Sequence, residues 1–135
     1  MPYWKCYYHI VWGTKNRQPI IKSEHESVIH AIIDKKANLL KSHVLGINGT
    51  SDHLHIAMAI HPSNNLAQLI GQLKGISSRE VNQSFILETP FQWQESYGVL
   101  TFSEREMPII LNYITHQKEH HATGKIWHEF EEVTE

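Results

Sequence analysis

Two short segments of the chain carry residue types that can do chemistry together. His53-Leu54-His55 places two imidazoles at alternate positions of an apolar segment, and Tyr113 lies four residues before Gln117 in a segment of helical character. Alternate residues of a strand point to one face, and residues four apart share one face of a helix. Imidazole nitrogens and amide oxygens bind divalent ions, and a phenol can attack phosphorus. The two segments therefore predict a metal site with a nucleophile beside it.

We expect His53, His55 and Gln117 to hold Mg²⁺ or Mn²⁺. An amide oxygen suits these hard ions, and three protein ligands leave positions for phosphate oxygens and water. Asp52 is expected to orient one imidazole by accepting a hydrogen bond from its ring. Each segment also has a simpler interpretation, because two imidazoles on a half-exposed strand show the same spacing. A tyrosine among isoleucines, such as Tyr113, is often a core residue.

Three more imidazoles crowd the segment that carries the phenol. His116 and His120 have the i, i+4 spacing of a zinc site, but the His-Glu-x-x-His pattern of metalloproteases is absent. We therefore expect His116, His120 and His121 to face solvent or phosphate, and their role stays open.

The composition is that of a single globular domain over residues 1–135, with an acidic tail over about 122–135. The chain is 41% hydrophobic and 19% charged. No apolar run approaches the roughly 18 residues of a membrane span, and the N-terminal residues have no signal-peptide character, so we expect a cytoplasmic protein. Cys6 is the only cysteine, which excludes an internal disulfide.

The charge balance argues against a general affinity for nucleic acid. The net charge is −2, although the last seven residues hold four of the 14 acidic side chains and the rest of the chain carries +2. Any DNA site must therefore be a local patch. The candidates for phosphate contacts are Lys15, Arg17, Lys74 and Arg79. A solvated surface is the alternative for these cations, and core packing is the alternative to base stacking for Trp93 and Tyr97.

Side-chain periodicity predicts strands and helices in the order β-α-β-β-α-β-α. We expect strands over 3–12, 44–48, 52–60 and 97–102. We expect helices over 24–42, after Pro62 with Ser63 or Asn64 as the cap, and from the capping box Ser103–Glu106 to about His121. This order is typical of a ferredoxin-like α+β fold, in which helices pack on an antiparallel sheet, followed here by a C-terminal helix that carries Tyr113.

Three details of these elements bear on the site. Ser23 and Glu26 have the spacing of a capping box for the first helix. Gly71 and Gly75 each cost about 1 kcal/mol inside a helix, so the second helix is either packed closely there or ends near Gly75. The small side chains of Ala57 and Ala59 lie on the face of the two imidazoles, which leaves room above that face for a ligand or another helix.

Five blocks of sequence occur in a specific order. They are Tyr8-His9-Ile10-Val11-Trp12 with Thr14-Lys15-Asn16-Arg17, Asp52-His53-Leu54-His55, Leu73-Lys74-Gly75 with Ser77-Ser78-Arg79, Trp93-Gln94 with Tyr97-Gly98, and residues 113–121. In these blocks the chain resembles the single-tyrosine HUH transposases, of both the insertion-sequence type and the REP-associated type, where HUH stands for His-hydrophobe-His. The resemblance covers about residues 3–121, and the acidic balance departs from what is usual for a DNA enzyme.

The resemblance implies that Tyr113 attacks a phosphodiester in single-stranded DNA, forms a 5′-phosphotyrosine and releases a 3′-hydroxyl. The ion on His53, His55 and Gln117 would serve this step without a nucleotide cofactor, and the chain has no Gly-x-x-x-x-Gly-Lys-Ser/Thr loop. The implied substrates are hairpin-containing ends of a mobile element. The implied partner is a second copy of the chain in a homodimer with shared active sites, and no membrane is expected as a partner.

Other classes of function remain open. A ferredoxin-like sheet can bind single-stranded nucleic acid without cutting it, and such a module needs neither a metal pair nor Tyr113 beside Gln117. A domesticated, non-mobile relative would keep the same residues. A metal-dependent hydrolase that uses water would turn over many times without a covalent protein–DNA species.

Overall fold

Alternation of apolar and polar side chains builds the sheet at the centre of the fold. In the computed structural model, which describes residues 3–119, the strands are β1 (Tyr7–Gly13), β2 (His43–Gly49), β3 (His53–Ala59) and β4 (Gly98–Phe102). They pair antiparallel in the order β2-β3-β1-β4. The expected acidic tail lies outside the described residues. The ferredoxin-like α+β fold predicted from the sequence is confirmed.

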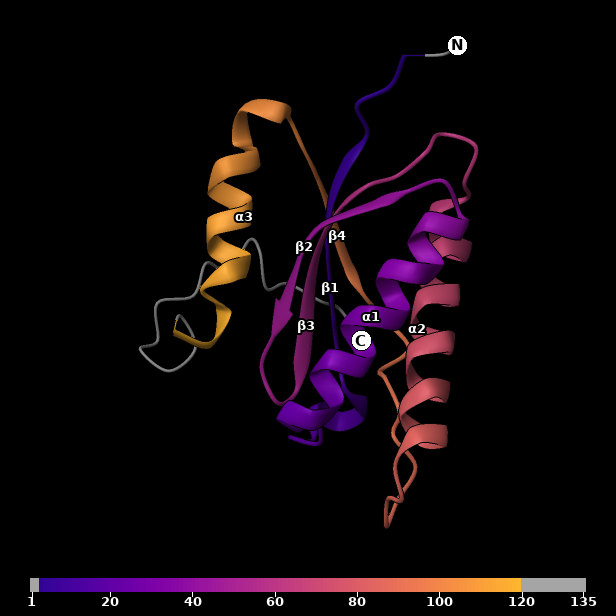
Figure 1. The fold of residues 1–135 in the computed structure, drawn as a ribbon. Helices are drawn as coiled ribbons and strands as arrows, with labels where there is room; N and C mark the ends of the chain where they lie inside the picture. Colours follow the sequence, from indigo (N-terminus) through magenta and orange to yellow (C-terminus); the bar gives the residue numbers. More distant parts are fainter. Residues whose placement is uncertain (1–2, 120–135) are drawn as a thin grey trace.

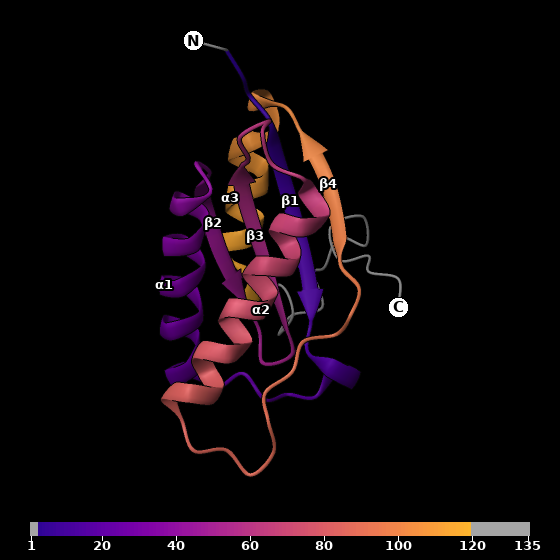
Figure 2. The ribbon, with the colours of Figure 1, turned by 90° about the vertical axis from the view of Figure 1, so that its right-hand side faces the viewer.

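Helices cover both faces of this sheet (Figure 1). The helices α1 (Ser23–Leu39) and α2 (Leu66–Ser84) pack side by side on one face, and α3 (Met107–Thr115) packs on the other. Figure 2 shows α1 and α2 in front of the strands and α3 behind them. Two short 3₁₀ turns, η1 (Lys15–Arg17) and η2 (Glu104–Glu106), precede α1 and α3. In the part of the chain described, no helix is long and apolar enough to cross a membrane.

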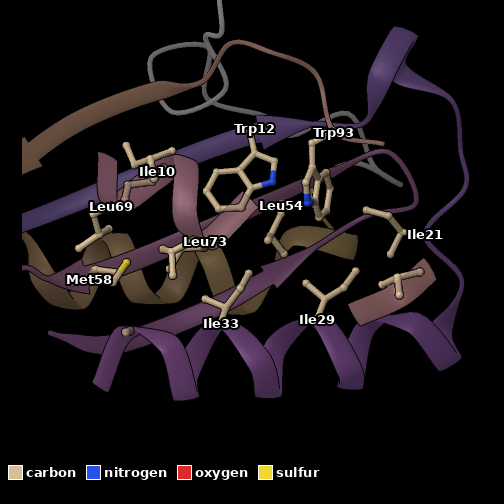
Figure 3. Packing of buried hydrophobic residues seen from close by; sticks show 14 of the residues in the cluster. Ile10, Trp12, Ile21, Ile29, Ile33, Leu54, Met58, Leu69, Leu73 and Trp93 are labelled. Carbon is tan, nitrogen blue, oxygen red and sulfur yellow. The ribbon is translucent and has the colours of Figure 1, made fainter. Parts of the chain in front are cut away.

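The larger hydrophobic core lies between the sheet and the α1–α2 layer (Figure 3). Strands β1 and β3 contribute Ile10, Trp12, Leu54, Ile56 and Met58, and the helices contribute Ile29, Ile33, Leu69 and Leu73. Because side chains alternate along a strand, the intervening residues of β1 and β3 must face α3. These include the two imidazoles of the His-Leu-His segment, so the main core and the polar residues occupy opposite faces of the same two strands.

A smaller apolar cluster attaches α3 to the sheet. Ile110 and Ile114 of α3 pack with Ala57 of β3 and Phe102 of β4, and all four are buried. The helix lies close because Ala57 is small. The space predicted above Ala57 is thus occupied by a helix, and that helix belongs to the same chain.

The ends of α1 and α2 differ from the prediction by one or two residues. The predicted capping box at Ser23 is wrong, because α1 already begins at Ser23. The imidazole Nδ1 of His25 accepts the hydrogen bond from the backbone N–H of Lys22 instead. In α2 the cap is Asn65, whose side chain accepts from the N–H of Gln68 at 3.1 Å.

The two residues expected to cap α2 are engaged elsewhere. The hydroxyl of Ser63 lies 2.7 Å from Nδ1 of His61, and the amide of Asn64 donates to the carbonyl of Leu40 at 2.9 Å. Ser63 therefore stabilises the loop before α2 internally, Asn64 ties that loop to the end of α1, and the next residue is left to cap the helix.

The start of the third helix agrees with its capping box, but its end does not. Glu106 accepts a hydrogen bond from the N–H of Ser103 at 2.9 Å, and the regular helix follows from Met107. It was expected to run to about His121. Instead α3 ends at Thr115, His116 adopts a turn, and helical backbone resumes at residues 117–119.

The glycines of α2 fit neither alternative derived from the sequence. The helix continues past Gly75 to Ser84, and no atom lies within 4 Å of the position a Cβ would take at Gly71 or Gly75. Both glycines therefore face open space. Gly49, at the end of β2, is different, because a Cβ there would overlap the backbone carbonyl oxygen of His53.

This contrast makes a prediction for stability. Gly71→Ala should raise the free energy of unfolding by about 0.5–1 kcal/mol, because alanine costs less backbone entropy in a helix and meets no neighbour. Gly49→Ala should lower it by about 1–3 kcal/mol through overlap with the strand that carries His53. Urea unfolding of both variants checks the prediction, and a Gly49→Ala protein as stable as wild type would contradict this account of the turn.

Candidate active site

The candidate site lies between the sheet and α3. Alternation in β1 and β3 directs His9, His53 and His55 to the α3 face, and α3 and the turn after it bring Tyr113 and Gln117 onto them. All five side chains are buried, none more than 2% exposed. The structure therefore gathers the predicted ligands and the predicted nucleophile within one chain, together with a third imidazole.

His53 is held from one side and faces Gln117 on the other. Its Nδ1 lies 2.7 Å from a carboxylate oxygen of Asp52 and 2.8 Å from the hydroxyl of Thr50. Its Nε2 lies 3.4 Å from the amide oxygen of Gln117. A carboxylate that accepts from Nδ1–H fixes the tautomer in which Nε2 carries the lone pair. Asp52 thus stands where the orienting role assigned to it requires it to be.

Tyr113 lies against the second imidazole. The ring centroids of His55 and Tyr113 are 5.9 Å apart with an edge-on angle of 72°, and those of His53 and His55 are 5.1 Å apart. The side-chain amide of Gln117 donates to the backbone carbonyl of Tyr113 at 3.4 Å. Although the helix is interrupted at His116, the i, i+4 pair still faces one site.

The donor set contains two imidazoles and one amide oxygen, which together could hold a divalent ion. Among the described residues, no group of three or more His, Cys, Asp or Glu side chains is arranged to hold a metal. A site on His53 and His55 therefore depends on the amide oxygen of Gln117 as its third ligand. The amide oxygen suits Mg²⁺ or Mn²⁺, neutral imidazole is a common ligand of divalent metals, and three protein ligands would leave positions open for phosphate oxygens.

The C-terminal end of α3 is tied to β2 and α1. The side-chain amide of Asn48 donates to the carbonyl of Thr115 at 3.0 Å. The ammonium of Lys118 donates to Asn48 at 3.0 Å and to the carbonyl of Gly49 at 3.1 Å, and it pairs with Glu26 at 2.7 Å. These contacts flank Gln117 on both sides and hold it against His53. These contacts were not predicted from the sequence, in which Asn48 was only the last residue of an expected strand.

His9 also belongs to the site, although the sequence assigned it no role. It lies on β1 opposite Ala57, and its Nε2 is 2.8 Å from Nδ1 of His55. Its position in the alternation of β1 was the only signal available. The partner strand, and therefore the neighbour of its ring, is known only from the fold.

The four predicted phosphate contacts divide between two places. Arg17 lies at the His53 end of the site, 3.7 Å from Asp52, and its side chain crosses the space that a Cβ would take at Gly13. Asn16 and Arg17 both have positive φ, of 57° and 53°. Such a backbone is uncommon outside glycine, and here it turns the guanidinium back over the sheet.

Lys15 and Lys74 instead line a cleft of about 1070 Å³ formed by η1, α2 and residues 91–97. The ammonium of Lys74 donates to the carbonyls of Glu95 and Ser96 at 3.0 and 3.1 Å, so it holds that segment in place. Arg79 is exposed on α2, next to Ser78 of the cleft wall.

The two aromatic candidates for base stacking differ. The indole N–H of Trp93 donates to the hydroxyl of Ser77 at 2.9 Å, and its ring packs edge-on against Trp12 and Phe91. Trp93 is therefore part of the core. Tyr97 is half-buried and lines the cleft.

His116 lies away from the imidazole cluster. It is exposed, and its Nδ1 donates to the carbonyl of Asn112 at 2.8 Å. His120 and His121 lie outside the described residues. The geometry therefore places no metal on His116 together with the other imidazoles of the site.

The pKa of the Asp52 carboxyl is lowered from its ordinary value of 3.8. The hydrogen bond from His53 is the main cause, with smaller contributions from the electrostatic interaction with His53, the Thr50 hydroxyl and the charge of Arg17, while partial burial opposes them. Asp52 is therefore an ionised acceptor at neutral pH.

Asp52→Asn should accordingly alter the pH dependence of stability. A lowered folded-state pKa adds stability above the ordinary pKa, and this is lost as the pH falls through the lowered value. We expect metal-free Asp52→Asn to be about 1 kcal/mol less stable than wild type at pH 7, with the difference shrinking below about pH 4. Urea unfolding between pH 3 and 7 measures this, with Asp34→Asn on the exposed side of α1 as the control. A difference that stays constant over that range would contradict it.

Comparison with known proteins places the chain in a family. Residues 2–117 match the family model described as transposase IS200 like. The transposase for insertion sequence element IS200 of Salmonella typhimurium is 28% identical over 127 residues, which are 90% of this chain and 83% of that protein. The ISDra2 transposase TnpA of Deinococcus radiodurans is 26% identical over 115 residues, 82% of each chain.

Two solved structures share the fold. The crystal structure of a candidate transposase from Deinococcus radiodurans superposes with a TM-score of 0.70 at 27% identity, over 86% of this chain and 93% of that one. A REP-associated tyrosine transposase bound to a REP hairpin superposes with a TM-score of 0.67 at 12% identity, over 93% and 73% of the two chains.

Proposed function

Because the chain belongs to the IS200-like transposase family, we propose that it cuts and rejoins single-stranded DNA by transesterification, with Tyr113 as the nucleophile and a divalent ion as the cofactor. The observation that supports this most directly is the convergence of Tyr113 with the imidazole pair and Gln117 in one buried site. A module that only binds DNA does not require this convergence.

In the proposed step the phenolic oxygen of Tyr113 forms a bond to phosphorus, the bond from phosphorus to the 3′ oxygen breaks, and that oxygen leaves as a 3′-hydroxyl with the proton lost from the phenol. A phenol has a pKa near 10 and is a weak nucleophile at neutral pH. An ion held by His53, His55 and Gln117 would supply positive charge for the scissile phosphate oxygens. A second 3′-hydroxyl reverses the step, so strands are joined without ATP.

Before this step, neighbouring residues of the protein hold the side chains of the site in position. The hydrogen bond to Asp52 holds the ring of His53, and Asn48 with Lys118 holds the end of α3. Because Tyr113 is only 1% exposed, the site must open before a phosphodiester reaches the phenolic oxygen. Arg17, at the His53 end of the site, is placed to meet the phosphate backbone as it enters, and Lys15 with Arg79 provides cations on the cleft side.

The covalent step makes the first prediction of this proposal. Tyr113→Phe should abolish the covalent adduct between the protein and labelled single-stranded element-end DNA, because no other group replaces the phenolic oxygen. Binding of the same DNA should change little. Denaturing gels with and without Mn²⁺ measure the adduct, with Tyr3→Phe at an exposed position as the control. An adduct that persists in Tyr113→Phe would assign the nucleophile to another residue.

The same gels distinguish the proposed function from the other candidate functions. His53→Ala should lose metal-dependent cleavage and stay folded, whereas His43→Ala on the exposed edge of β2 should cleave normally. DNA binding without an adduct in wild type would instead support a non-catalytic module, and multiple turnover without an adduct would support a hydrolase. A domesticated, non-mobile relative would form the adduct as a mobile one does.

The proposal extends to a cytoplasmic homodimer that acts on hairpin-containing DNA ends and has shared active sites. In such a dimer, α3 of one copy makes on its partner the contacts that it makes here within one chain. The contacts of Ile110 and Ile114 with the sheet, and of Asn48 with Thr115, would be the same in either arrangement.

Mixing two inactive variants tests the shared sites. Tyr113→Phe protein lacks the nucleophile and His53→Ala protein lacks a ligand, so a mixed dimer with exchanged helices contains one complete site. We expect up to about half of the dimers in an equimolar mixture to regain adduct formation, which a titration of one variant into the other quantifies. Failure of a verified mixed dimer to form any adduct would assign the site to single chains.

A further inference from the structure

His9 and His55 form a buried pair of imidazoles across two strands. His9 lies on β1 opposite Ala57, and His55 lies two residues earlier on β3, so both rings point to the α3 face. Nε2 of His9 is 2.8 Å from Nδ1 of His55, and the ring centroids are 5.1 Å apart at an angle of 35°. Neither residue is more than 2% exposed. This distance is that of a strong hydrogen bond, so one proton lies between the two nitrogens.

The position of that proton decides what His55 can do. A neutral imidazole has one N–H and one nitrogen with a lone pair. If His9 donates, Nδ1 of His55 is the acceptor, the proton of His55 is on Nε2, and Nε2 has no lone pair for an ion. If His55 donates from Nδ1, then Nε2 carries the lone pair. Only the second arrangement lets His55 coordinate through Nε2.

We infer that His9 is a positioning residue that accepts the Nδ1–H of His55 and thereby holds His55 in the tautomer and ring orientation that present Nε2 to a divalent ion. This inference rests on the proposed function for the ion, but the tautomer itself does not. The neighbouring ligand supports it, since Asp52 makes the corresponding contact with Nδ1 of His53. Each imidazole of the proposed pair then has its own acceptor.

The two acceptors differ in charge, since Asp52 is a carboxylate and His9 is neutral. This difference suits a site that must bind a negatively charged phosphate. Asp52 is a carboxylate 34% exposed at the rim, whereas His9 is buried behind the site. A second carboxylate at that depth would carry a large desolvation cost and add negative charge where phosphate must bind. A neutral imidazole orients His55 without that charge.

The burial of His9 also argues against a role in packing alone. Its strand position faces the apolar side of α3, where a hydrocarbon side chain would fill the space without polar atoms. Burying an imidazole there carries a desolvation cost, and the bond to His55 offsets part of it by giving Nε2 of His9 a partner. The choice of His at this position is thus explained by its neighbour on β3.

Two variants separate orientation from packing. His9→Gln keeps an acceptor oxygen at similar reach, and His9→Phe keeps the volume without an acceptor. In metal-free protein labelled with ¹⁵N-histidine, wild type and His9→Gln should show His55 protonated on Nδ1. His9→Phe should shift His55 toward protonation on Nε2. The control is His43→Phe on the exposed edge of β2, which should leave the His55 signals unchanged.

Mn²⁺ binding gives a second readout without DNA. Titration followed by electron paramagnetic resonance should show affinity reduced 10–100-fold in His9→Phe and within about threefold of wild type in His9→Gln. If His9→Phe does not fold, nitrogen–nitrogen coupling across the bond in wild type still locates the proton. Wild-type His55 protonated on Nε2, or His9→Phe with unchanged tautomer and affinity, would overturn the inference. Absence of a DNA adduct in a protein with the expected tautomer would defeat the proposed function and leave the role of His9 standing.

Discussion

The pairing register of β1 with β3 is the constraint on which the site depends. Gly13 lies opposite His53, Val11 opposite His55, and His9 opposite Ala57. Because side chains alternate, this one register places all three imidazoles on the α3 face and Ile10, Trp12 and Ile56 in the main core. A slip of one residue would exchange the two sets, burying imidazoles in the hydrocarbon layer. The hydrophobic core on one face therefore enforces the chemistry on the other.

The positions of Tyr113 and Gln117 depend on how closely α3 packs on this face of the sheet. Small side chains on the sheet admit the helix closely, since Ile114 packs on Ala57 and a Cβ at Gly46 would lie 3.0 Å from Leu111. Apolar contacts set the distance, and the hydrogen bond from Asn48 to the carbonyl of Thr115 sets the axial position. Tyr113 and Gln117 gain their places from residues that have no chemical role themselves.

Burial of the site fixes the orientation of its side chains and also keeps them out of contact with solvent. Polar groups out of water must have partners, so Asp52, Thr50 and His9 hold the rings of His53 and His55 in defined orientations. The same burial keeps the phenol of Tyr113 away from solvent. Under the proposed function, a movement must therefore uncover Tyr113 before DNA can reach it. The hydrogen bonds and the ion pair of Lys118, together with Asn48, hold the C-terminal end of α3 in place.

Much of the fold was determined by local sequence, because period-two and helical patterns reflect burial directly. The strands and helices, their order, the capping box at Ser103 and the pairing of Tyr113 with Gln117 were all available from the chain alone. Helix ends were less certain. Several neighbouring polar residues are able to cap a helix, and only the tertiary contacts of Ser63 and Asn64 show why Asn65 does so.

The tertiary structure decided which segments distant in the chain contact each other. The sequence identified His53, His55, Tyr113 and Gln117 as chemical groups, but only the packing of α3 showed that a single chain can bring them together. It also separated Arg17 from Lys74, which had appeared as equal cations. His9 acquires a role only through its neighbour 46 residues away. Residue type and spacing indicate what chemistry a side chain can do. The partner of that side chain depends on which surfaces pack together in the fold, and the partner determines its protonation and orientation.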